Sequence, residues 1–151
     1  MRAVIQRAKS GRVRTEGKTE SIGKGYVILL GVAQDDSEQD ALYLAEKIVS
    51  MRVFSDENDK FNYSLQDIKG EALIISQFTL YADTLKGRRP DFTKAARPEK
   101  AKPLYEFLCS KVADKGIIVK TGIFGASMTV DIENDGPVTI VIDSRQKIHV
   151  S

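Results

Sequence analysis

The chain contains few of the residues that enzymes most often use for chemistry. Its 151 residues include one cysteine, one histidine, four prolines and no tryptophan. The single Cys109 excludes a disulfide within the chain, which favours a reducing compartment and predicts a cytoplasmic location. His149 is the only histidine, and the acidic residues lack metal-ligand spacing, so we predict no metal and no cofactor. Histidine-assisted nucleophiles and metal-dependent hydrolysis are thereby disfavoured.

Long apolar segments are also absent. The longest uncharged apolar run, at about residues 25–34, is half of what spans a bilayer, and the first residues are too short an apolar stretch for a signal peptide. No membrane association is therefore predicted. The length fits one domain, and 42% hydrophobic with 29% charged residues is ordinary for a globular protein. We expect a domain over 1–143 and a polar tail over 144–151.

The net charge is only +2, but the charges are unevenly distributed. Residues 1–15 carry basic side chains without an acid. A second basic segment, 84–103, holds Lys86, Arg88, Arg89, Lys94, Arg97, Lys100 and Lys102 against Asp91 and Glu99. Such a segment is either an ordinary solvated face or a surface that faces phosphates, and the sequence leaves both open.

Hydrophobic periodicity predicts strands and two helices. The strands are expected at 3–8, 12–15, 26–32, 52–55, 71–77, 117–121, 127–133 and 138–143, with turns at 10–11 and 134–137. One helix is expected over 38–50, capped by Ser37; the other begins at Pro98 or at Pro103 and stops at Gly116. The pattern predicts an α/β domain of mixed sheets and leaves no room for a doubly wound nucleotide-binding fold. Cys109 is expected to be a small residue of the core.

Two short segments stand where a strand gives way to a loop. Ser76-Gln77-Phe78-Thr79-Leu80 follows one predicted strand, and Asn134-Asp135-Gly136-Pro137-Val138-Thr139 lies between two others. Considered separately, the first is typical of a strand end and the second of a turn. The hydroxyls of Ser76 and Thr79 have no histidine to activate them, so an ordinary serine esterase is disfavoured.

Taken together, the two segments closely resemble the paired signature motifs of the D-aminoacyl-tRNA deacylases. The resemblance extends over residues 1–143 and includes Met1 to Arg7, Gly31-Val32, Arg52-Val53-Phe54-Ser55-Asp56, Gly87-Arg88-Arg89-Pro90-Asp91-Phe92 and Thr121-Gly122-Ile123-Phe124-Gly125-Ala126-Ser127-Met128. It implies a deacylase-type fold, in which mixed, partly barrel-like β-sheets are covered by two main helices. It further implies a homodimer that hydrolyses the ester of a D-amino acid, or of mischarged glycine, on tRNA.

The resemblance also assigns residues. Ser76, Gln77, Phe78 and Thr79 would line the ester site, while Phe124 and Met128 would hold the terminal adenine. Gly136 and Pro137, joined by a cis peptide in the family, would enter the partner subunit's pocket and reject an L side chain. Val138 and Thr139 complete that segment, and Arg7 would steady it. Backbone N–H groups near Phe78 and Thr79 would stabilise the oxyanion.

Two alternatives remain at this stage. In a rival mechanism Thr79 is a covalent nucleophile, whereas the side-chain-independent mechanism uses water assisted by the substrate's own 2′-hydroxyl. A protein of another class, a non-catalytic RNA-binding module related to synthetase editing domains, would share the basic segment. Only the deacylase needs both Ser76 to Thr79 and the Gly136-Pro137 corner.

Overall fold

A computed structural model of the chain describes residues 1–146. Its elements, in chain order, are β1 (Arg2–Thr15), β2 (Lys18–Ile22), β3 (Gly25–Gly31), α1 (Glu38–Ser50), β4 (Arg52–Ser55), β5 (Phe61–Ser64), β6 (Glu71–Ser76), the 3₁₀ helix η1 (Phe78–Tyr81), α2 (Pro98–Ala113), β7 (Ile118–Thr121), β8 (Thr129–Asp143) and the 3₁₀ helix η2 (Ser144–Gln146). The strands β2 and β5 and both 3₁₀ helices were not predicted.

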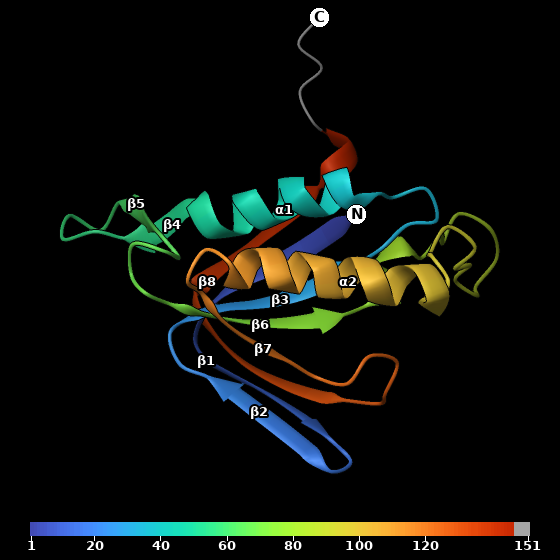
Figure 1. The fold of residues 1–151 in the computed structure, drawn as a ribbon, viewed down its shortest axis with the longest axis horizontal. Helices are drawn as coiled ribbons and strands as arrows, with labels where there is room; N and C mark the ends of the chain where they lie inside the picture. Colours follow the sequence, from blue (N-terminus) through green and yellow to red (C-terminus); the bar gives the residue numbers. More distant parts are fainter. Residues whose placement is uncertain (147–151) are drawn as a thin grey trace, which may run out of the picture.

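The main sheet is mixed and strongly curved. Its strand order is β2-β1-β3-β6-β7, with β8 paired to β1, while β4 and β5 form a separate hairpin. The pairs of β3 with β6 and of β6 with β7 are parallel, and the others are antiparallel. Both helices lie against one face of the sheet (Figure 1). The predicted fold, a partly barrel-like mixed sheet covered by two helices, is confirmed.

The central strands are apolar on both faces because two cores lie on either side of them. Alternate residues of β3, among them Tyr26 and Ile28, join the larger core under the helices. Val27, between them, belongs to the smaller core on the opposite face, together with Leu73 and Ile75 of β6. Side chains alternate across a strand, so a strand between two cores becomes a continuous apolar run. This explains the runs at 26–32 and 71–77.

The predicted turn at Ser10-Gly11 is wrong, because β1 continues through it to Thr15. A Cβ atom on Gly11 would lie 2.5 Å from Cγ2 of Val27. The glycine is therefore required by close packing against β3, which sequence punctuation does not distinguish from a turn. The long strand that results pairs with three others.

The predicted turn at 134–137, between strands at 127–133 and 138–143, is also wrong. Both segments run along β1 in the same direction and form the single strand β8. Asn134 stands opposite Ala8 and Thr139 opposite Gln6, so residues 135–138 form an irregularity in the ladder facing Arg7. The sequence Asn-Asp-Gly-Pro produces a local corner in β8 and does not reverse the chain. The Gly136-Pro137 peptide is cis.

The helices begin and end for local reasons. Asp40 of α1 accepts a hydrogen bond from the Ser37 backbone N–H at 2.9 Å, as predicted for a capping box. The second helix begins at Pro98 and contains Pro103 inside it, which settles the choice between the two starts. Its buried stripe is Ala101, Leu104, Tyr105, Leu108 and Val112. Cys109 packs beside that stripe against the larger core, as predicted.

The two ends of the described chain meet beside α1. The α-ammonium of Met1 is fully buried and lies 2.8 Å from both Oδ1 of Asp36 and Oγ of Ser144. Ser144 in turn donates to Asp40 at 2.7 Å. Residues 144–146 of the expected tail are therefore packed as η2, and the predicted domain limit at 143 stays a prediction. His149 lies outside the described residues.

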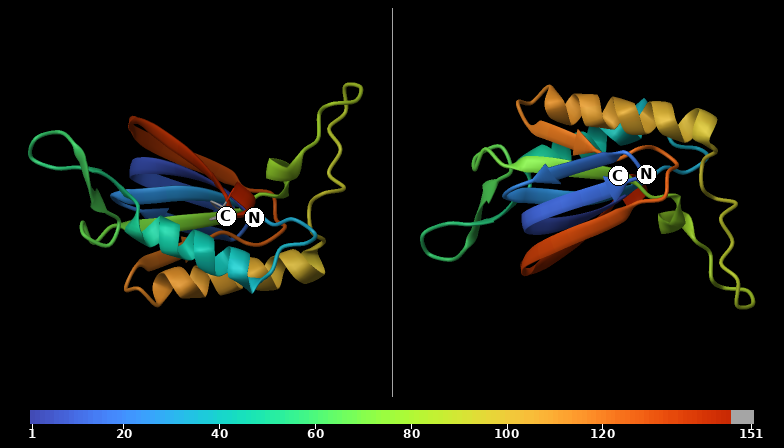
Figure 2. Two further views of the ribbon diagram at one scale, coloured as in Figure 1. Left: turned by 90° about the horizontal axis from the view of Figure 1, so that it is seen from above. Right: turned by 90° about the horizontal axis from the view of Figure 1, so that it is seen from below.

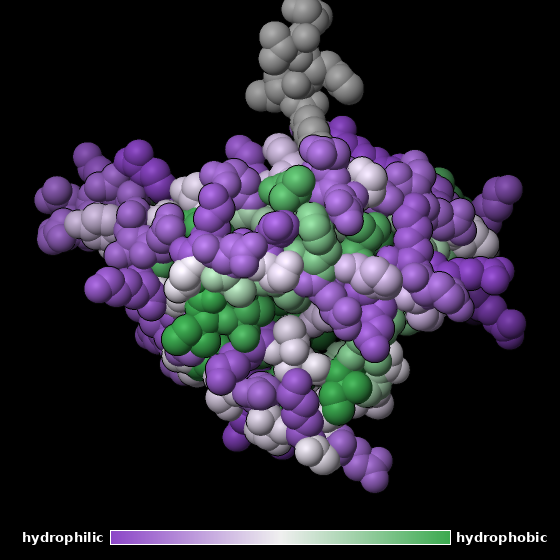
Figure 3. Space-filling model, viewed as in Figure 1, coloured by the Kyte–Doolittle hydropathy of each residue, from purple (hydrophilic) through white to green (hydrophobic). Residues whose placement is uncertain are grey.

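The surface of the helix-covered face is mostly polar. Figure 3 shows apolar side chains there in small, separate areas among hydrophilic ones. No helix within residues 1–146 combines the length and apolar character needed to cross a membrane. Two segments project from the body, the β4–β5 hairpin at one end and the loop between η1 and α2 at the other (Figure 2).

Candidate active site

A pocket of about 610 Å³ opens where β6 ends, beside the first turn of α2. The loop between β7 and β8 forms its remaining wall. Its lining residues are mostly apolar: Val32, Ile75, Ser76, Gln77, Phe78, Phe92, Ala95, Ala96, Arg97, Pro98, Ala101, Phe124, Gly125, Ala126, Met128 and Val130. An apolar pocket with few polar groups is typical of a small-molecule or substrate site.

The first predicted segment changes structure at the pocket. The backbone N–H of Gln77 donates to Leu30 O at 2.8 Å and so holds the end of β6 against β3. The chain then turns into η1. This segment can lie close to the end of β3 because Gly31 has no side chain, and a Cβ atom there would lie 3.1 Å from Gln77 O. The N–H groups of Phe78 and Thr79 open this 3₁₀ helix, and neither has an acceptor in the described part of the chain. Two backbone donors are therefore free, one on Phe78, which lines the pocket, and one on Thr79, the next residue.

The segment Phe124 to Met128 forms the opposite wall. It contains a tight turn in which Ala126 N donates to Ile123 O at 3.1 Å. The ring of Phe124 packs on Tyr105 of α2, with centroids 5.9 Å apart. A Cβ on Gly122 would lie 2.4 Å from Sδ of Met128, so this glycine leaves room for the thioether beside the pocket. Both predicted adenine-binding residues thus face the same cavity as Ser76, Gln77 and Phe78.

The Gly136-Pro137 corner is held by two side chains. Asn134 accepts from the Val138 N–H at 2.8 Å, and its amide nitrogen lies within 3.2 Å of Val138 O. Arg7, a buried residue, donates through Nε to Asp135 O at 2.9 Å and through Nη1 to Val53 O at 2.7 Å. Gly136 and Pro137 themselves are exposed. The corner is therefore a fixed projection on the surface of β8.

The structure brings some of the predicted site residues together in one pocket and places the others elsewhere. Ser76, Gln77, Phe78, Phe124 and Met128 line one pocket. Thr79 follows directly on Phe78 but does not line the pocket, although its hydroxyl accepts a hydrogen bond from the Gln77 amide. The second group, Arg7, Gly136, Pro137, Val138 and Thr139, is absent from the pocket lining of its own chain.

The chemistry available at the pocket is limited. Arg97 is the only charged residue among its lining. Within residues 1–146 there is no group of three or more histidine, cysteine, aspartate or glutamate side chains placed to hold a metal ion. Burial raises the pKa of Cys109 to about 12 and also raises the pKa of Tyr105, whose hydroxyl donates to Ile74 O at 2.6 Å. Neither group is ionised near neutral pH, so positioning and backbone donors are the main resources of the site.

Two contributors were missed by sequence reasoning. Phe92 lines the pocket and packs edge-on against Phe78, with centroids 5.1 Å apart, although it comes from the basic loop. Asn134 was identified as part of a turn and of the second signature segment but was given no role, although its side chain fastens the corner. The preference of asparagine for bonding its own backbone was an available signal for Asn134. Nothing in the local pattern indicates the contact of Phe92, which depends on how the loop returns.

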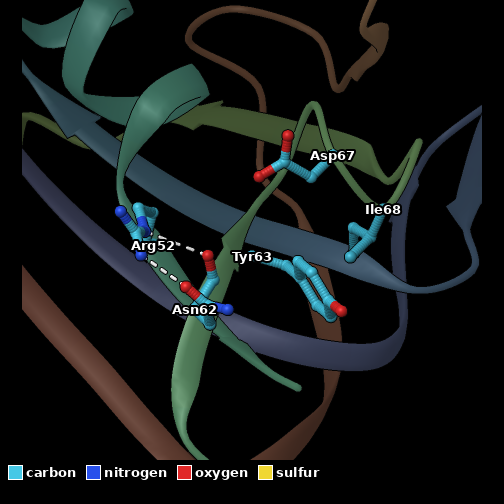
Figure 4. Close-up of a pocket in the computed structure, with 5 residues that line it drawn as sticks. All are labelled: Arg52, Asn62, Tyr63, Asp67 and Ile68. Atoms are coloured by element: carbon cyan, nitrogen blue, oxygen red, sulfur yellow. Dashed lines mark hydrogen bonds between the residues drawn. The ribbon is translucent and has the colours of Figure 1, made fainter. Parts of the chain in front are cut away.

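A second hollow, of about 480 Å³, lies at the β4–β5 hairpin. Its lining is Arg52, Asn62, Tyr63, Asp67 and Ile68, shown in Figure 4. Arg52 donates to the backbone and side-chain oxygens of Asn62, and Asp67 accepts from Ser64 N at 2.9 Å. These polar groups are already engaged in holding the hairpin, which favours a structural role.

Comparison with known proteins defines the class. A family described as D-Tyr-tRNA(Tyr) deacylase matches residues 4–143. Proteins named D-aminoacyl-tRNA deacylase from Thermus aquaticus and Clostridioides difficile are 53% and 54% identical; the matches cover 97% and 95% of this chain and 97% of each relative. The chain therefore belongs to the D-aminoacyl-tRNA deacylase family, a family of hydrolases.

Solved structures agree on the fold. One named c-Myc DNA Unwinding Element Binding Protein has a TM-score of 0.87 at 38% identity, covering 95% of this chain and 98% of that one. Another, titled as a probable eukaryotic D-amino acid tRNA deacylase, has a TM-score of 0.81 at 18% identity, covering 93% and 97%. The second likeness concerns the fold alone.

Proposed function

We propose that this protein hydrolyses the ester between a D-amino acid and the terminal adenosine of tRNA. The reaction releases the free D-amino acid and the tRNA, and it takes place in the cytoplasm. The observation that carries the proposal is the pocket that Ser76, Gln77 and Phe78 line together with Phe124 and Met128, with free N–H groups on Phe78 and on the next residue, Thr79. Membership of the deacylase family and the names of relatives over half identical support the same substrate class.

The mechanism we infer uses backbone donors and substrate groups. Water attacks the ester carbonyl carbon with help from the ribose 2′-hydroxyl, and the bond to the ribose oxygen then breaks as that oxygen takes up a proton. The N–H groups of Phe78 and Thr79 stabilise the negative charge on the carbonyl oxygen. Each such donor is typically worth about 10² to 10³ in rate. Phe124 and Met128 hold the adenine and so position the ester.

Chiral selection is proposed to come from a second copy of the chain. The Gly136-Pro137 corner would enter the partner's pocket, where its main-chain carbonyls read the α-amino group and leave no space for an L side chain. Val138 and Thr139 would extend this contact. Support comes from the corner's exposure, from its attachment by Asn134 and Arg7, and from its absence from its own chain's pocket. Glycine, with no side chain, would escape rejection and also be hydrolysed, which is specificity by exclusion.

The decisive measurement is hydrolysis of matched D- and L-aminoacyl-tRNA, with glycyl-tRNA as a third substrate. We expect rapid release of the D-amino acid and of glycine, and retention of the L ester. Equal hydrolysis of D and L esters would overturn the chiral role of the corner. Binding of tRNA without hydrolysis of any ester would instead support the RNA-binding module.

A single substitution separates the two mechanisms. Thr79→Ala removes the hydroxyl and leaves the backbone N–H in place. We expect nearly complete retention of D-aminoacyl-tRNA hydrolysis, because the hydroxyl has no base to activate it. A fall to the uncatalysed rate would identify Thr79 as the nucleophile.

The two-chain site can be tested by crosslinking. A chain carrying both Gln77→Cys and Pro137→Cys, treated with a short bifunctional thiol reagent, should form a covalent dimer. A matched chain carrying Gln77→Cys and Glu16→Cys should stay monomeric on a denaturing gel, because Glu16 is exposed at the β1–β2 turn, at the far end of β1 from Arg7 and the corner. Crosslinking of neither chain, together with a monomeric mass in solution, would exclude the shared site.

A further inference from the structure

The loop between η1 and α2 contains a distinct projection that we call the basic arm, residues 83–91. It extends away from the body of the molecule (Figure 2). Its base is closed by a pair of backbone hydrogen bonds, from Asp83 N to Asp91 O at 2.7 Å and from Asp91 N to Asp83 O at 2.8 Å. The arm is therefore a closed loop with a defined base.

The acidic residues at the base are engaged, and the basic residues at the tip are free. Asp83 accepts from Leu85 N at 3.0 Å and pairs with Lys94, while Asp91 accepts from Thr93 N at 2.7 Å. That backbone hydrogen bond holds the pKa of Asp91 below its ordinary value. Lys86, Arg88 and Arg89 are exposed and have no ion pair or hydrogen bond in the described chain. The tip thus presents three uncompensated positive charges to solvent.

The arm is attached to the rim of the pocket. Phe92, the residue next to its base, lines the pocket and packs on Phe78. Arg97 continues the positive charge along the lining. A ligand whose end enters the pocket would therefore extend past the arm. Positive side chains without partners next to a pocket favour a polyanion whose charges lie outside the cavity.

We propose that the basic arm binds the phosphate backbone of the RNA whose 3′ end occupies the pocket. This inference rests on the proposed function, because that function supplies the RNA. Lys86, Arg88 and Arg89 would contact phosphates and would not read bases, so they add affinity without selecting an amino acid. The pocket and the corner then determine which ester is cleaved, and the arm determines how well a long RNA is held.

The test compares two substrates with a variant that lacks the arm's charge. The variant is Lys86→Gln/Arg88→Gln/Arg89→Gln, and its control is Lys47→Gln/Lys60→Gln/Lys69→Gln, which removes three charges from α1 and the segment around β4 and β5. The substrates are D-aminoacyl-tRNA and the corresponding D-aminoacyl-adenosine, which has no phosphate. We expect kcat/KM of the arm variant to fall at least about tenfold on tRNA and to stay unchanged on the nucleoside ester. The salt dependence of log kcat/KM should also weaken by about one unit of slope for each lost phosphate contact.

The possible results are distinguishable from failure of the proposed function. Equal kcat/KM for the arm variant and the control on tRNA at every salt concentration would overturn the role of the arm. An equal fall on both substrates would also overturn it, since the substitutions would then have altered the pocket. If the wild-type chain hydrolyses neither ester, the proposed function fails. The arm is then tested by fluorescence anisotropy with uncharged tRNA, where loss of affinity in the arm variant alone supports its role and unchanged affinity overturns it.

Discussion

Gly136 occupies a position where a side chain would meet three obstacles. Its φ of +137° is one that L residues rarely adopt, and a Cβ would lie 2.8 Å from Cγ2 of Val138, 3.0 Å from Val138 N and 3.1 Å from Nη2 of Arg7. Gly17 also has a positive φ, of +86°, but nothing lies within 4 Å of its Cβ position. Substitutions at the two glycines therefore separate the cost of an unfavourable backbone conformation from the cost of steric crowding.

We expect Gly17→Ala to cost about 1 kcal/mol of unfolding free energy, which is the usual cost of a left-handed L residue. Gly136→Ala should cost more, about 3 kcal/mol, because the new methyl group also displaces Arg7 or Val138. Urea denaturation of both variants measures the difference. Equal losses would show that the corner adjusts without resistance.

The buried ammonium of Met1 depends on one carboxylate. Asp36 is 1% exposed and pairs with it at 2.8 Å, whereas the neighbouring Asp35 is 73% exposed and pairs with Arg145 at the surface. Asp36→Asn should destabilise the fold by about 3 to 5 kcal/mol, because it leaves a buried charge without its partner. Asp35→Asn should cost less than about 1 kcal/mol, as for most surface pairs. Chemical denaturation measures the unfolding free energy of both variants. Similar losses would contradict the conclusion that Asp36 is the partner of the buried ammonium.

At the scale of elements, α2 contains a proline where a helix would otherwise continue its hydrogen bonding. Pro103 is exposed and lies five residues after Pro98, which opens the helix. An interior proline removes a backbone donor and costs about 3 kcal/mol, whereas a proline at the first position is well tolerated. Pro103→Ala should therefore raise the unfolding free energy by at least about 1 kcal/mol after allowance for the freer unfolded chain. Pro98→Ala should change it little. A stability loss on Pro103→Ala would show that the proline fits a distorted turn.

How far the sequence predicted each element depended on whether the cause was local. The helix α1 and the strand β4 were predicted at the observed limits because periodicity, a capping residue and β-rich composition are all local signals. Gly11 and the Asn134 to Pro137 segment misled the prediction. Their turn-like composition serves a packing contact with Val27 and a corner opposite Arg7, and both depend on distant strands. The pocket residues were identified through family resemblance, because hydroxyls, an amide and a phenylalanine form no chemical pattern of their own.

At the scale of the whole molecule, carboxylates near the packed chain ends link stability to pH. Burial tends to raise the pKa of Asp143, but the hydrogen bond from Arg2 at 2.9 Å and the backbone N–H of Arg145 outweigh it, and the net pKa is lowered. Asp40, which accepts from Ser144, is also lowered despite its burial. A carboxyl with a lowered folded pKa stabilises the fold when ionised. That contribution is complete above the unfolded value of about 3.9 and disappears as pH falls through the folded value.

We therefore expect the unfolding free energy to fall as pH decreases below about 4. The difference between the wild type and Asp143→Asn should be largest near neutral pH and should shrink in the same acidic range. Urea denaturation at a series of pH values from neutral to strongly acidic measures both curves. A difference that stays constant across the series would show that the Asp143 contacts do not depend on its charge.

The first strand of the chain has a consequence for how the protein is made. Of the described elements β1 is synthesised first, yet its longest partner, β8, is among the last. Until β8 emerges, one edge of β1 has no strand to pair with, and unpaired edges of this kind favour association with other chains. The barrel-like sheet can therefore be completed only after residues up to Asp143 have been synthesised. For most of its elongation the nascent chain has an open sheet edge. Chaperones or rapid release would have to protect that edge from association.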